Sequence, residues 1–487
     1  MRPLAICEVT AEAAPFAKTG GLGDAVAGLT RMLGAAEQDV RLFLPLYPAI
    51  WRQGHDLVPV DFLRDVTIWL GTRELRFSAY TTPLPASDVA VYFLHCPALF
   101  HQDGIYTAGW DEHYRFAFLS VAALTCCQRM GWAPDILHVH DWHAALTPLY
   151  ARTLFAWDRL FAATRSVLTL HNLGHHGVFG GHTIGELGLE PYRGLLPPED
   201  LAADQLSFLK NGIRHADLLT TVSETYAREI LTPEGGFGLD GLLRERAASL
   251  VGIVNGIDYG DWDPRHDPHL PHHYGATDLA GKARMKRALL ERVGMEAGDE
   301  VPVVGMVSRL VEQKGIDLCF ESLPAQLGRH DFRLVVLGSG EARYEAFFHA
   351  LQATFPGRVW FYRGYHEPLA HWIEAGADIF LMPSRYEPCG LNQLYSLRYG
   401  TPPVVRRTGG LADTVEPYSW EAGTGTGFVF ADYTAAGLAW ALDYALTTFA
   451  HPEAWRGLQR RGMALDFSWE RQGRAYLELF RNLAGGA

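Results

Sequence analysis

A carboxylate in the second half of the chain stands where a strand is expected to end and a helix to begin. The segment 385–393 reads Arg-Tyr-Glu-Pro-Cys-Gly-Leu-Asn-Gln, and its carboxylate is Glu387. The apolar run 377–382 before it is typical of a buried parallel strand, and a helical pattern begins at Leu394. Glu387 can accept hydrogen bonds from sugar hydroxyls, whereas free amides at a helix start suit a phosphate. A site with both properties favours a nucleotide-sugar.

Two cations follow another expected strand, 303–307. Arg309 and Lys314 lie in the loop Ser-Arg-Leu-Val-Glu-Gln-Lys-Gly over 308–315. A forked guanidinium and a compact ammonium are suited to a departing diphosphate. The alternative is a pair of solvated loop side chains.

A glycine-rich segment near the N-terminus has a similar position. Lys18-Thr19-Gly20-Gly21-Leu22-Gly23-Asp24 follows an expected strand over 4–9 and precedes an expected helix over 25–33. Glycines let backbone amides approach a phosphate, and Lys18 adds a positive charge. The spacing matches neither the dinucleotide fingerprint nor the Walker loop, so a tight turn with a solvated lysine stays open as the alternative.

Histidines gather at two further strand ends. The first group is His138-Val139-His140-Asp141-Trp142-His143, and the second is the pair His171-Asn172. A zinc site was considered, but residues 138 and 140 alternate along a strand and no HExxH helix is present. Hydrogen bonding to sugar hydroxyls or capping of the core is favoured, and the pair at 171–172 is suited to presenting a carbonyl at a cleft.

Other strand ends in the second half carry weaker signals. Tyr365 could contact a base, and Thr408 with the neighbouring amides could contact a phosphate. Gly338-Ser339-Gly340 could line a nucleotide pocket. The segments at 338–340 and 363–365 are equally consistent with plain turns. The absence of a GxSxG motif argues against an α/β-hydrolase.

Bulk properties limit the class of protein. The 42 basic and 55 acidic residues give a net charge of −13, which argues against a general nucleic-acid surface. Six cysteines without a CxxC pair indicate reduced thiols in the cytoplasm. Glu8 and Glu12 interrupt any N-terminal signal region, and no apolar run of about 18 residues predicts a membrane span. A soluble cytoplasmic enzyme is expected.

A chain of 487 residues predicts two large domains. Strand-like and helix-like segments alternate in both halves, which is the pattern of an α/β protein with doubly wound parallel sheets. We expect an N-terminal domain over 1–250, a C-terminal domain over 251–466, and a helix within 467–487 that packs back on the first domain. A cleft between two such domains would be a favoured ligand site.

Together these segments resemble the bacterial glycogen synthases and plant starch synthases over nearly the whole chain. The motifs that carry the resemblance occupy 18–22, 140–143, 171–172, 254–258, 308–315, 387–391, 408–415 and 467–470. The resemblance implies a GT-B fold, with two Rossmann-like domains facing across a deep cleft. It also implies transfer of glucose from ADP-glucose to the non-reducing end of an α-1,4-glucan such as glycogen, with retention of configuration. No metal or cofactor is expected.

The resemblance also implies roles for individual residues. Lys18, Arg309 and Lys314 match phosphate-binding positions, Glu387 the carboxylate that holds the transferred glucose, and His171 the residue whose backbone carbonyl faces the anomeric carbon. Asp141 and Asn255 match sugar or cleft contacts, and Tyr365 an adenine-side position. The remaining positions expected at the donor site are Gly20, Gly21, Asn172, Cys389, Gly390, Leu391, Asn392 and Thr408.

Two departures from the family pattern bear on the preference for donor and acceptor. Asn392 stands where threonine is common, and Gly174-His175-His176 replaces Ala-Tyr-Gln. The acceptor surface is less defined, with Tyr106, Trp142 and the segment 180–206 as candidates.

Three alternatives remain open. The first is a related transferase that uses UDP-glucose or a small acceptor. The second is a catalytically silent glucan-binding protein. Such a protein would be expected to have lost charge or bulk at Lys18, Arg309, Lys314 or Glu387, and all four residues are present. The third is a glucan phosphorylase, which would need pyridoxal phosphate on a lysine.

Overall fold

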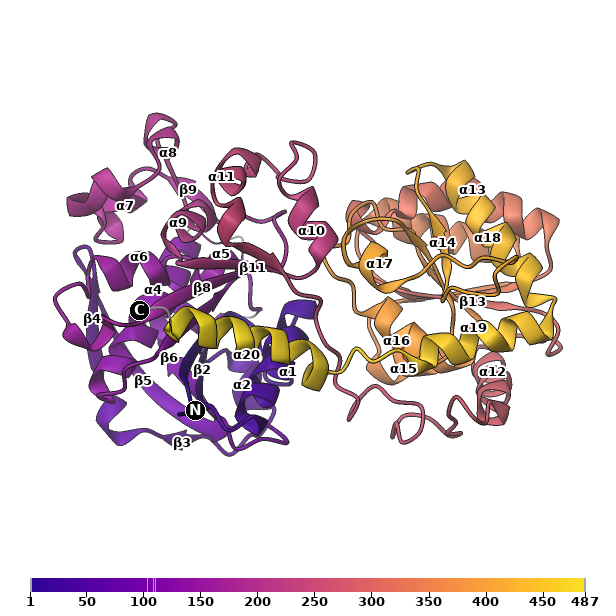
Figure 1. Cartoon of the computed structure of the whole chain (residues 1–487), viewed down its shortest axis with the longest axis horizontal. Coiled ribbons are helices and arrows are strands. Elements are labelled where there is room, and N and C mark those ends of the chain that lie inside the picture. Colours follow the sequence, from indigo (N-terminus) through magenta and orange to yellow (C-terminus); the bar gives the residue numbers. More distant parts are fainter. Residues whose placement is uncertain (1, 103, 108, 110, 486–487) are drawn as a thin grey trace. The chain divides into compact units, whose positions relative to one another are not determined.

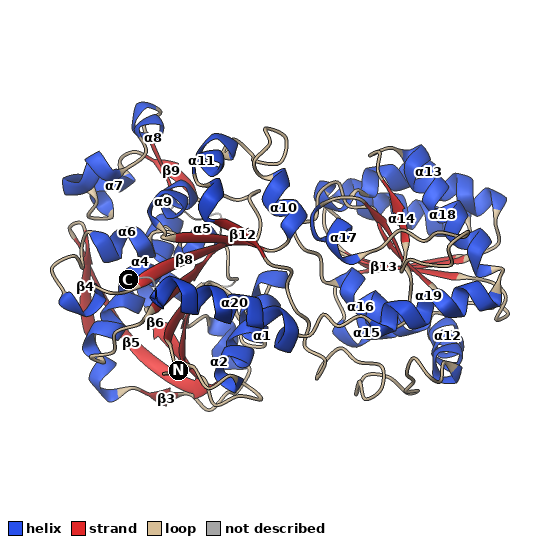
Figure 2. Ribbon diagram, viewed as in Figure 1, coloured by secondary structure: helices blue, strands red, loops and turns tan. Residues whose placement is uncertain are grey.

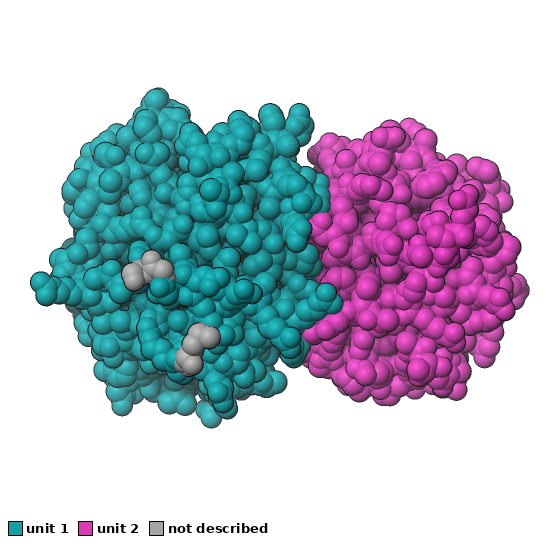
Figure 3. All heavy atoms as spheres, in the orientation of Figure 1, with its two compact units in different colours: residues 1–256, 469–487 teal, residues 257–468 magenta. Residues whose placement is uncertain are grey.

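The computed structural model describes residues 2–102, 104–107, 109 and 111–485, and the chain divides into two compact units (Figure 3). Unit 1 comprises residues 1–256 and 469–487, and unit 2 comprises residues 257–468. Each unit has its own parallel sheet with helices on its faces (Figure 2). The predicted α/β class with parallel sheets in both halves is therefore confirmed.

The sheet of unit 1 runs in the order β12-β11-β8-β7-β1-β2-β6-β5-β3, with β4 paired to β5. The strands from β12 to β6 are parallel, and β3, β4 and β5 pair antiparallel. A separate antiparallel pair joins β9 and β10. The bounds are β1 Ala5–Val9, β2 Asp39–Pro45, β3 Val58–Pro59, β4 Val66–Leu70, β5 Arg73–Pro83, β6 Ala90–His95, β7 Ile136–His140, β8 Arg165–Leu170, β9 Val178–Gly180, β10 Gln205–Ser207, β11 Leu218–Thr221 and β12 Leu250–Gly252.

The helices of unit 1 include one that comes from the end of the chain. The bounds are α1 Gly21–Ala35, α2 Pro48–Arg52, α3 Pro97–Phe100, α4 Glu112–Arg129, α5 Asp141–Ala144, α6 Thr147–Arg152, α7 Thr183–Glu186, α8 Pro198–Ala202, α9 Phe208–His215, α10 Glu224–Glu229, α11 Asp240–Glu245 and α20 Trp469–Gly485. In Figure 1 the yellow α20 lies beside the indigo α1, and the two helices are in contact. Trp469, Tyr476 and Phe480 of α20 join the hydrophobic core of unit 1. A Cβ at Gly28 of α1 would lie 1.9 Å from Nε1 of Trp469, so the two helices approach at a position that only glycine permits.

The boundary expected at 250 falls at the first residue of β12. Because β12 still pairs in parallel with β11, the structure extends unit 1 to Gly256. The antiparallel strands β4 and β5 were not anticipated, although the alternating burial of Val66, Ile68 and Leu70 in β4 is a two-residue period that sequence reading can detect.

Unit 2 has a six-stranded parallel sheet in the order β15-β14-β13-β16-β17-β18. Numbered along the chain this order is 3-2-1-4-5-6, the doubly wound arrangement. The bounds are β13 Val303–Val307, β14 Arg333–Gly338, β15 Val359–Arg363, β16 Ile379–Met382, β17 Pro403–Arg406 and β18 Phe428–Phe430. The helices are α12 Ala280–Arg292, α13 Ile316–Arg329, α14 Ala342–Thr354, α15 Glu367–Gly376, α16 Asn392–Arg398, α17 Gly409–Thr414, α18 Ala435–Phe449 and α19 Pro452–Ala464.

The unit 2 sheet is buried on both faces, which explains why its strands read as continuous apolar runs. On β13, Val304 and Met306 belong to one core cluster, whereas Val303 and Val307 belong to another. Alternate residues of one strand thus fill two cores.

Each sheet has a point where the strand order reverses direction, and open α/β sheets bind ligands outside the carboxyl ends of strands at such points. In unit 2 the reversal lies between β13 and β16, and in unit 1 it lies between β1 and β7. Among the described residues, no helix is long and apolar enough to span a bilayer.

Candidate active site

At the reversal point of unit 2, two residues singled out from the sequence are in direct contact. Nζ of Lys314, from the loop after β13, lies 2.6 Å from Oε2 of Glu387, from the loop after β16. Oγ of Ser384 donates to the same carboxylate oxygen at 2.9 Å. Both charged side chains are largely buried, at 16% exposure for Lys314 and 7% for Glu387. An ammonium has three donors, so Lys314 keeps further N–H groups for an anion while it holds Glu387.

Glycines allow the loops of this site to pack closely. Gly315 has φ 68°, and a Cβ there would lie 2.0 Å from the carbonyl oxygen of Pro383. Gly409 has φ 42°, and a Cβ there would lie 2.0 Å from the carbonyl oxygen of Glu387. The amide of Gly410 donates to that same carbonyl at 3.0 Å. The loop after β17 therefore fixes the backbone of Glu387.

The other residues expected in unit 2 differ in exposure. Arg309 is exposed at the end of β13, and Tyr365 is 63% exposed after β15. Cys389 and Thr408 are buried, at 4% and 3%. Gly390 has φ 75°, and Leu391 caps the start of α16.

Asn392 has a structural contact that its sequence position did not reveal. Its Nδ2 donates to the carbonyl oxygen of Val307, the last residue of β13, at 2.8 Å. The side chain thus ties α16 to the strand that leads to Arg309 and Lys314.

In unit 1, Asp141 organises the backbone after β8. Asp141 follows β7 with φ 52°, a left-handed conformation that aspartate tolerates better than most residues. Its Oδ1 accepts hydrogen bonds from the amide of His171 at 2.7 Å and from that of Asn172 at 3.4 Å. Burial raises the pKa of Asp141 to about 7, although the two amides oppose this shift. Asn172 accepts from the amide of Gly174 at 2.9 Å, which closes the turn.

The loop after β1 is organised by a glutamate that sequence reading missed. Glu12 accepts from the amide of Thr19 at 2.6 Å and from its hydroxyl at 2.8 Å. The hydroxyl of Tyr106 also donates to Glu12. Lys18 forms an ion pair with Asp24 at 3.1 Å. Glu12 was considered only as an interruption of a signal region, whereas its position after a buried strand was the informative signal.

Gly20 and Gly21 lie where α1 begins, since Gly20 is the N-cap and Gly21 the first helical residue. The helix thus starts four residues ahead of the expected Ala25, and both glycines are exposed. A Cβ at Gly20 would meet nothing within 4 Å, so the protein itself does not require glycine there.

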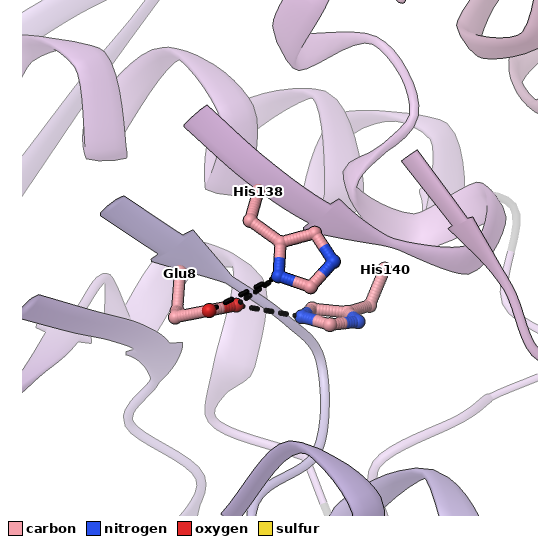
Figure 4. Close-up of side chains that lie close together, drawn as sticks. All are labelled: Glu8, His138 and His140. Atoms are coloured by element: carbon pink, nitrogen blue, oxygen red, sulfur yellow. Dashed lines mark hydrogen bonds and ion pairs between the residues drawn. The ribbon is translucent and has the colours of Figure 1, made fainter. Parts of the chain in front are cut away.

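A second missed carboxylate lies beneath the histidines. Glu8 of β1 pairs in register with His138 of β7, and His138 and His140 both contact its carboxylate (Figure 4). His138 Nδ1 lies 2.9 Å and His140 Nε2 lies 2.8 Å from Oε2 of Glu8. Nδ1 of His140 lies 3.1 Å from Nε2 of His171. The chain of contacts therefore runs from β1 through β7 to a residue predicted to be at the site.

The remaining candidate residues of unit 1 differ in burial. Asn255 is buried at 5%, one residue before the end of the first segment of unit 1. Trp142 is buried, whereas Tyr106 is 37% exposed and stacks on His143 with ring centroids 4.8 Å apart. The segment 180–206 contains α7 and α8.

The two reversal points therefore offer different chemistry. Unit 2 presents cations and a paired carboxylate, which suit an anionic leaving group and sugar hydroxyls. Unit 1 presents a backbone turn held by Asp141 and a buried histidine network, which suit oriented hydrogen bonds.

Comparison with protein families matches two parts of the chain. Residues 5–245 match the family described as "Starch synthase catalytic domain". Residues 291–457 match the family described as "Glycosyl transferases group 1". The two matches fall within units 1 and 2, respectively.

Individual relatives are similar over nearly the whole chain. A glycogen synthase of Anaeromyxobacter dehalogenans (strain 2CP-1) is 48% identical, with 98% of this chain and 99% of that protein covered. A glycogen synthase of Myxococcus xanthus is 45% identical, with 98% of both chains covered.

Two solved structures share the fold. The catalytic domain of starch synthase IV from Arabidopsis thaliana, bound to ADP and acarbose, has a TM-score of 0.93 at 32% identity and covers 99% of this chain and 100% of its own. Sucrose-phosphate synthase from Thermosynechococcus elongatus has a TM-score of 0.64 at 17% identity, with 99% of this chain and 100% of its own covered, and this likeness concerns the fold alone. The predicted GT-B class, with a Rossmann-like sheet in each unit, is confirmed.

Proposed function

Because this chain belongs to the family of bacterial glycogen synthases and plant starch synthases, we propose that it transfers glucose from ADP-glucose to the non-reducing end of an α-1,4-glucan, with retention of configuration. The observation that carries the proposal is the contact between Lys314 and Glu387 at the reversal point of the unit 2 sheet. It sets a cation for a diphosphate beside an acceptor for sugar hydroxyls.

In the proposed reaction, Lys314 and Arg309 stabilise the negative charge that develops on the diphosphate as the bond to the sugar breaks. Glu387 accepts hydrogen bonds from hydroxyls of the transferred glucose, and Ser384 and Lys314 fix its orientation. Gly409 and Gly410 hold the backbone of that loop in place.

Most of the unit 1 residues act on the sugar, and the loop that includes Lys18 acts on the phosphates. Asp141 holds the amides of His171 and Asn172, which orients the peptide that includes the carbonyl of His171. That carbonyl faces the anomeric carbon and stabilises positive charge as it develops there. Lys18, with the amides around Gly20 and Gly21, contacts the phosphates, and Asn255 contacts the sugar.

The donor is ADP-glucose in this proposal, with Tyr365 on the adenine side. The solved relative was bound to ADP, which supports an adenine nucleotide for this chain. All six cysteines are buried thiols, which fits a reducing compartment such as the cytoplasm; they are Cys7, Cys96, Cys126, Cys127, Cys319 and Cys389.

The test is release of ADP when the purified protein is incubated with glycogen and ADP-glucose. The proposal expects release that depends on glycogen, with a product that α-amylase degrades. ADP-glucose and UDP-glucose should be compared at equal concentration. Faster transfer from UDP-glucose would overturn the donor assignment, and no transfer from either donor would favour the silent glucan-binding alternative.

A further inference from the structure

Glu8 stands at the centre of a buried hydrogen-bond network that the proposed reaction does not use. Glu8, His138 and Thr169 have 0% exposure, and His140 has 1%. One branch runs from Glu8 to His138 and on to Thr169, whose Oγ1 lies 2.7 Å from Nε2 of His138 and 2.6 Å from the hydroxyl of Thr220. The other branch runs from Glu8 to His140 and on to His171.

The chemistry of each group fixes the direction of the second branch. An ionised carboxylate can only accept, so Nε2 of His140 must donate to Glu8. A neutral imidazole has one donor and one acceptor nitrogen, so Nδ1 of His140 must accept. Nε2 of His171 then donates to it, and Nδ1 of His171 is left as an acceptor.

The charge states agree with this arrangement. Burial opposes the charged form of Glu8, yet the neighbouring His138 and His140 lower its pKa to about 2. Burial lowers the pKa of His140 to about 4 and that of His171 well below its usual value. At neutral pH the branch therefore contains one negative carboxylate and two neutral rings.

A metal ion is the competing explanation for these residues. Ligand atoms of Glu8, His138 and His140 lie within 4.8 Å of one another. However, the ring nitrogens already lie 2.8 to 3.0 Å from the carboxylate oxygens, which is hydrogen-bond distance. Thr169 and His171 lie at hydrogen-bond distance from the far nitrogens. Hydrogen bonds thus account for both rings without an ion.

We propose that Glu8 is a positioning residue that acts through His140 to hold the neutral ring of His171 in the tautomer with the proton on Nε2. This inference rests on the proposed function, in which His171 borders the anomeric carbon. A neutral ring avoids repulsion with the positive charge that develops on the sugar, and its Nδ1 can accept a hydrogen bond from a hydroxyl. Asp141 fixes the backbone of His171, and Glu8 fixes its side chain.

The test compares Glu8→Leu with Thr169→Val. Leucine has a similar size to glutamate but offers no acceptor, so the direction of the bond between His140 and His171 is no longer fixed. Valine at 169 removes a buried hydroxyl from the same network but leaves the branch to His171 intact. Loss of a hydrogen-bond partner of a metal-bound histidine typically costs about 10- to 100-fold in activity, and we expect a loss of similar size in kcat for Glu8→Leu. The kcat of Thr169→Val should stay close to the parent value.

Measuring ADP binding distinguishes a loss of His171 positioning from general damage to the protein. Arg309 and Lys314 belong to unit 2, and Lys18 pairs with Asp24 at the surface of unit 1, whereas Glu8 is fully buried. The Kd for ADP of Glu8→Leu should therefore equal that of the parent in calorimetry. Equal kcat values for the two variants, or a Glu8→Leu defect confined to ADP binding, would overturn the proposal.

A measurement on the unaltered protein is independent of activity. Nitrogen chemical shifts of ¹⁵N-histidine-labelled protein distinguish the two tautomers, and His171→Asn identifies the signals of His171. The proposal expects protonation on Nε2, and protonation on Nδ1 or stoichiometric bound metal would refute it. If the protein transfers no glucose at all, the proposed function fails, while this spectrum still decides the assignment for Glu8.

Discussion

The reversal points of the two sheets have the same topology but opposite electrostatics. In unit 2 a carboxylate meets a cation directly, at 2.6 Å between Glu387 and Lys314, and both groups retain some exposure. In unit 1 the fully buried carboxylate of Glu8 meets two histidines that are at most 1% exposed, and the cation Lys18 lies at the surface in a pair with Asp24. A strand-order reversal thus supplies a place for a ligand, while the residues after the strands decide which part of the ligand it serves.

Under the proposed function, this contrast suggests different tasks for the two units. In the proposed reaction, Arg309 and Lys314 of unit 2 stabilise the departing diphosphate together with Lys18 of unit 1. The hydrogen bonds that fix Asp141, His140 and His171 of unit 1 would orient the sugar. The predictions below test this division.

The largest effect is expected for Lys314→Ala. The substitution removes a cation from the leaving group and leaves Glu387 as a buried carboxylate without its ion pair, so kcat/KM for glucose transfer should fall by about 10²- to 10³-fold or more. ADP release with glycogen measures it. Arg329→Ala removes an exposed cation from the end of α13 in the same unit and should leave the rate unchanged. A turnover of Lys314→Ala close to that of the parent would contradict the role of unit 2 in stabilising the leaving group.

Gly409→Ala should be the next most damaging change. The new Cβ would lie 2.0 Å from the carbonyl oxygen of Glu387, at a residue with φ 42°. The loop of Glu387 must then shift, and a displacement of a catalytic group by about 1 Å lowers the rate by about 10²-fold. Gly328→Ala provides the control, because a Cβ there meets nothing within 4 Å. A shared loss of activity would show that alanine is harmful for other reasons.

Two buried glutamates should respond to glutamine with opposite signs in stability. Both carboxylate oxygens of Glu374 in α15 are buried without a hydrogen-bond partner, and burial raises its pKa well above 4.5. The folded state therefore prefers the protonated form, and the stability of the parent falls as pH rises above about 4.5. Glu374→Gln should have a higher Tm than the parent at pH 8, with the difference shrinking towards pH 4.5.

Glu8→Gln should do the reverse. Its folded pKa of about 2 lies below the ordinary 4.5, so its contribution to stability is present above 4.5 and is lost as pH falls towards 2. Glu8→Gln should lower Tm at neutral pH, by less as the solution becomes more acidic. Thermal unfolding across pH measures both variants. Changes in Tm of the same sign would contradict the view that Glu8 has hydrogen-bond partners in the fold whereas Glu374 has none.

The smallest effect is expected for Gly20→Ala. Its Cβ would find open space, so Tm should not change. If backbone amides at this position approach a phosphate, the methyl group should raise KM for ADP-glucose by about tenfold, equivalent to about 1.4 kcal/mol. An unchanged KM would show that the amides around Gly20 do not contact the phosphates, and would leave Lys18 as the proposed phosphate contact of unit 1.

Sequence reading singled out Arg309, Lys314 and Glu387 because the strands of unit 2 are continuous apolar runs, and these residues lie in the loops after two of them. It did not identify their contact, since the adjacency of β13 and β16 depends on the order of all six strands. In unit 1 it recognised that His138 and His140 share a face of a strand. It missed Glu8, because a carboxylate within a strand becomes informative only when its neighbour in the sheet is known.

Glu374 was missed for a related reason. An acidic residue within a helical pattern is ordinarily taken as solvent-exposed, and only the packing of α15 reveals that its side chain is 1% exposed. Nearby Lys282, whose pKa burial lowers to about 7, donates instead to the carbonyl of Ala375 and the hydroxyl of Thr401. Long-range pairing of this kind leaves no local periodic signal.

The packing of α20 on α1 has a consequence for how the protein is made. Trp469, Tyr476 and Phe480 fill the core of unit 1, yet they are synthesised only after the whole of unit 2. Residues 257–468 are therefore complete while the first unit still lacks part of its interior. A nascent chain must hold an unfinished N-terminal unit until α20 has been synthesised, and loss of α20 would damage the unit that was synthesised first.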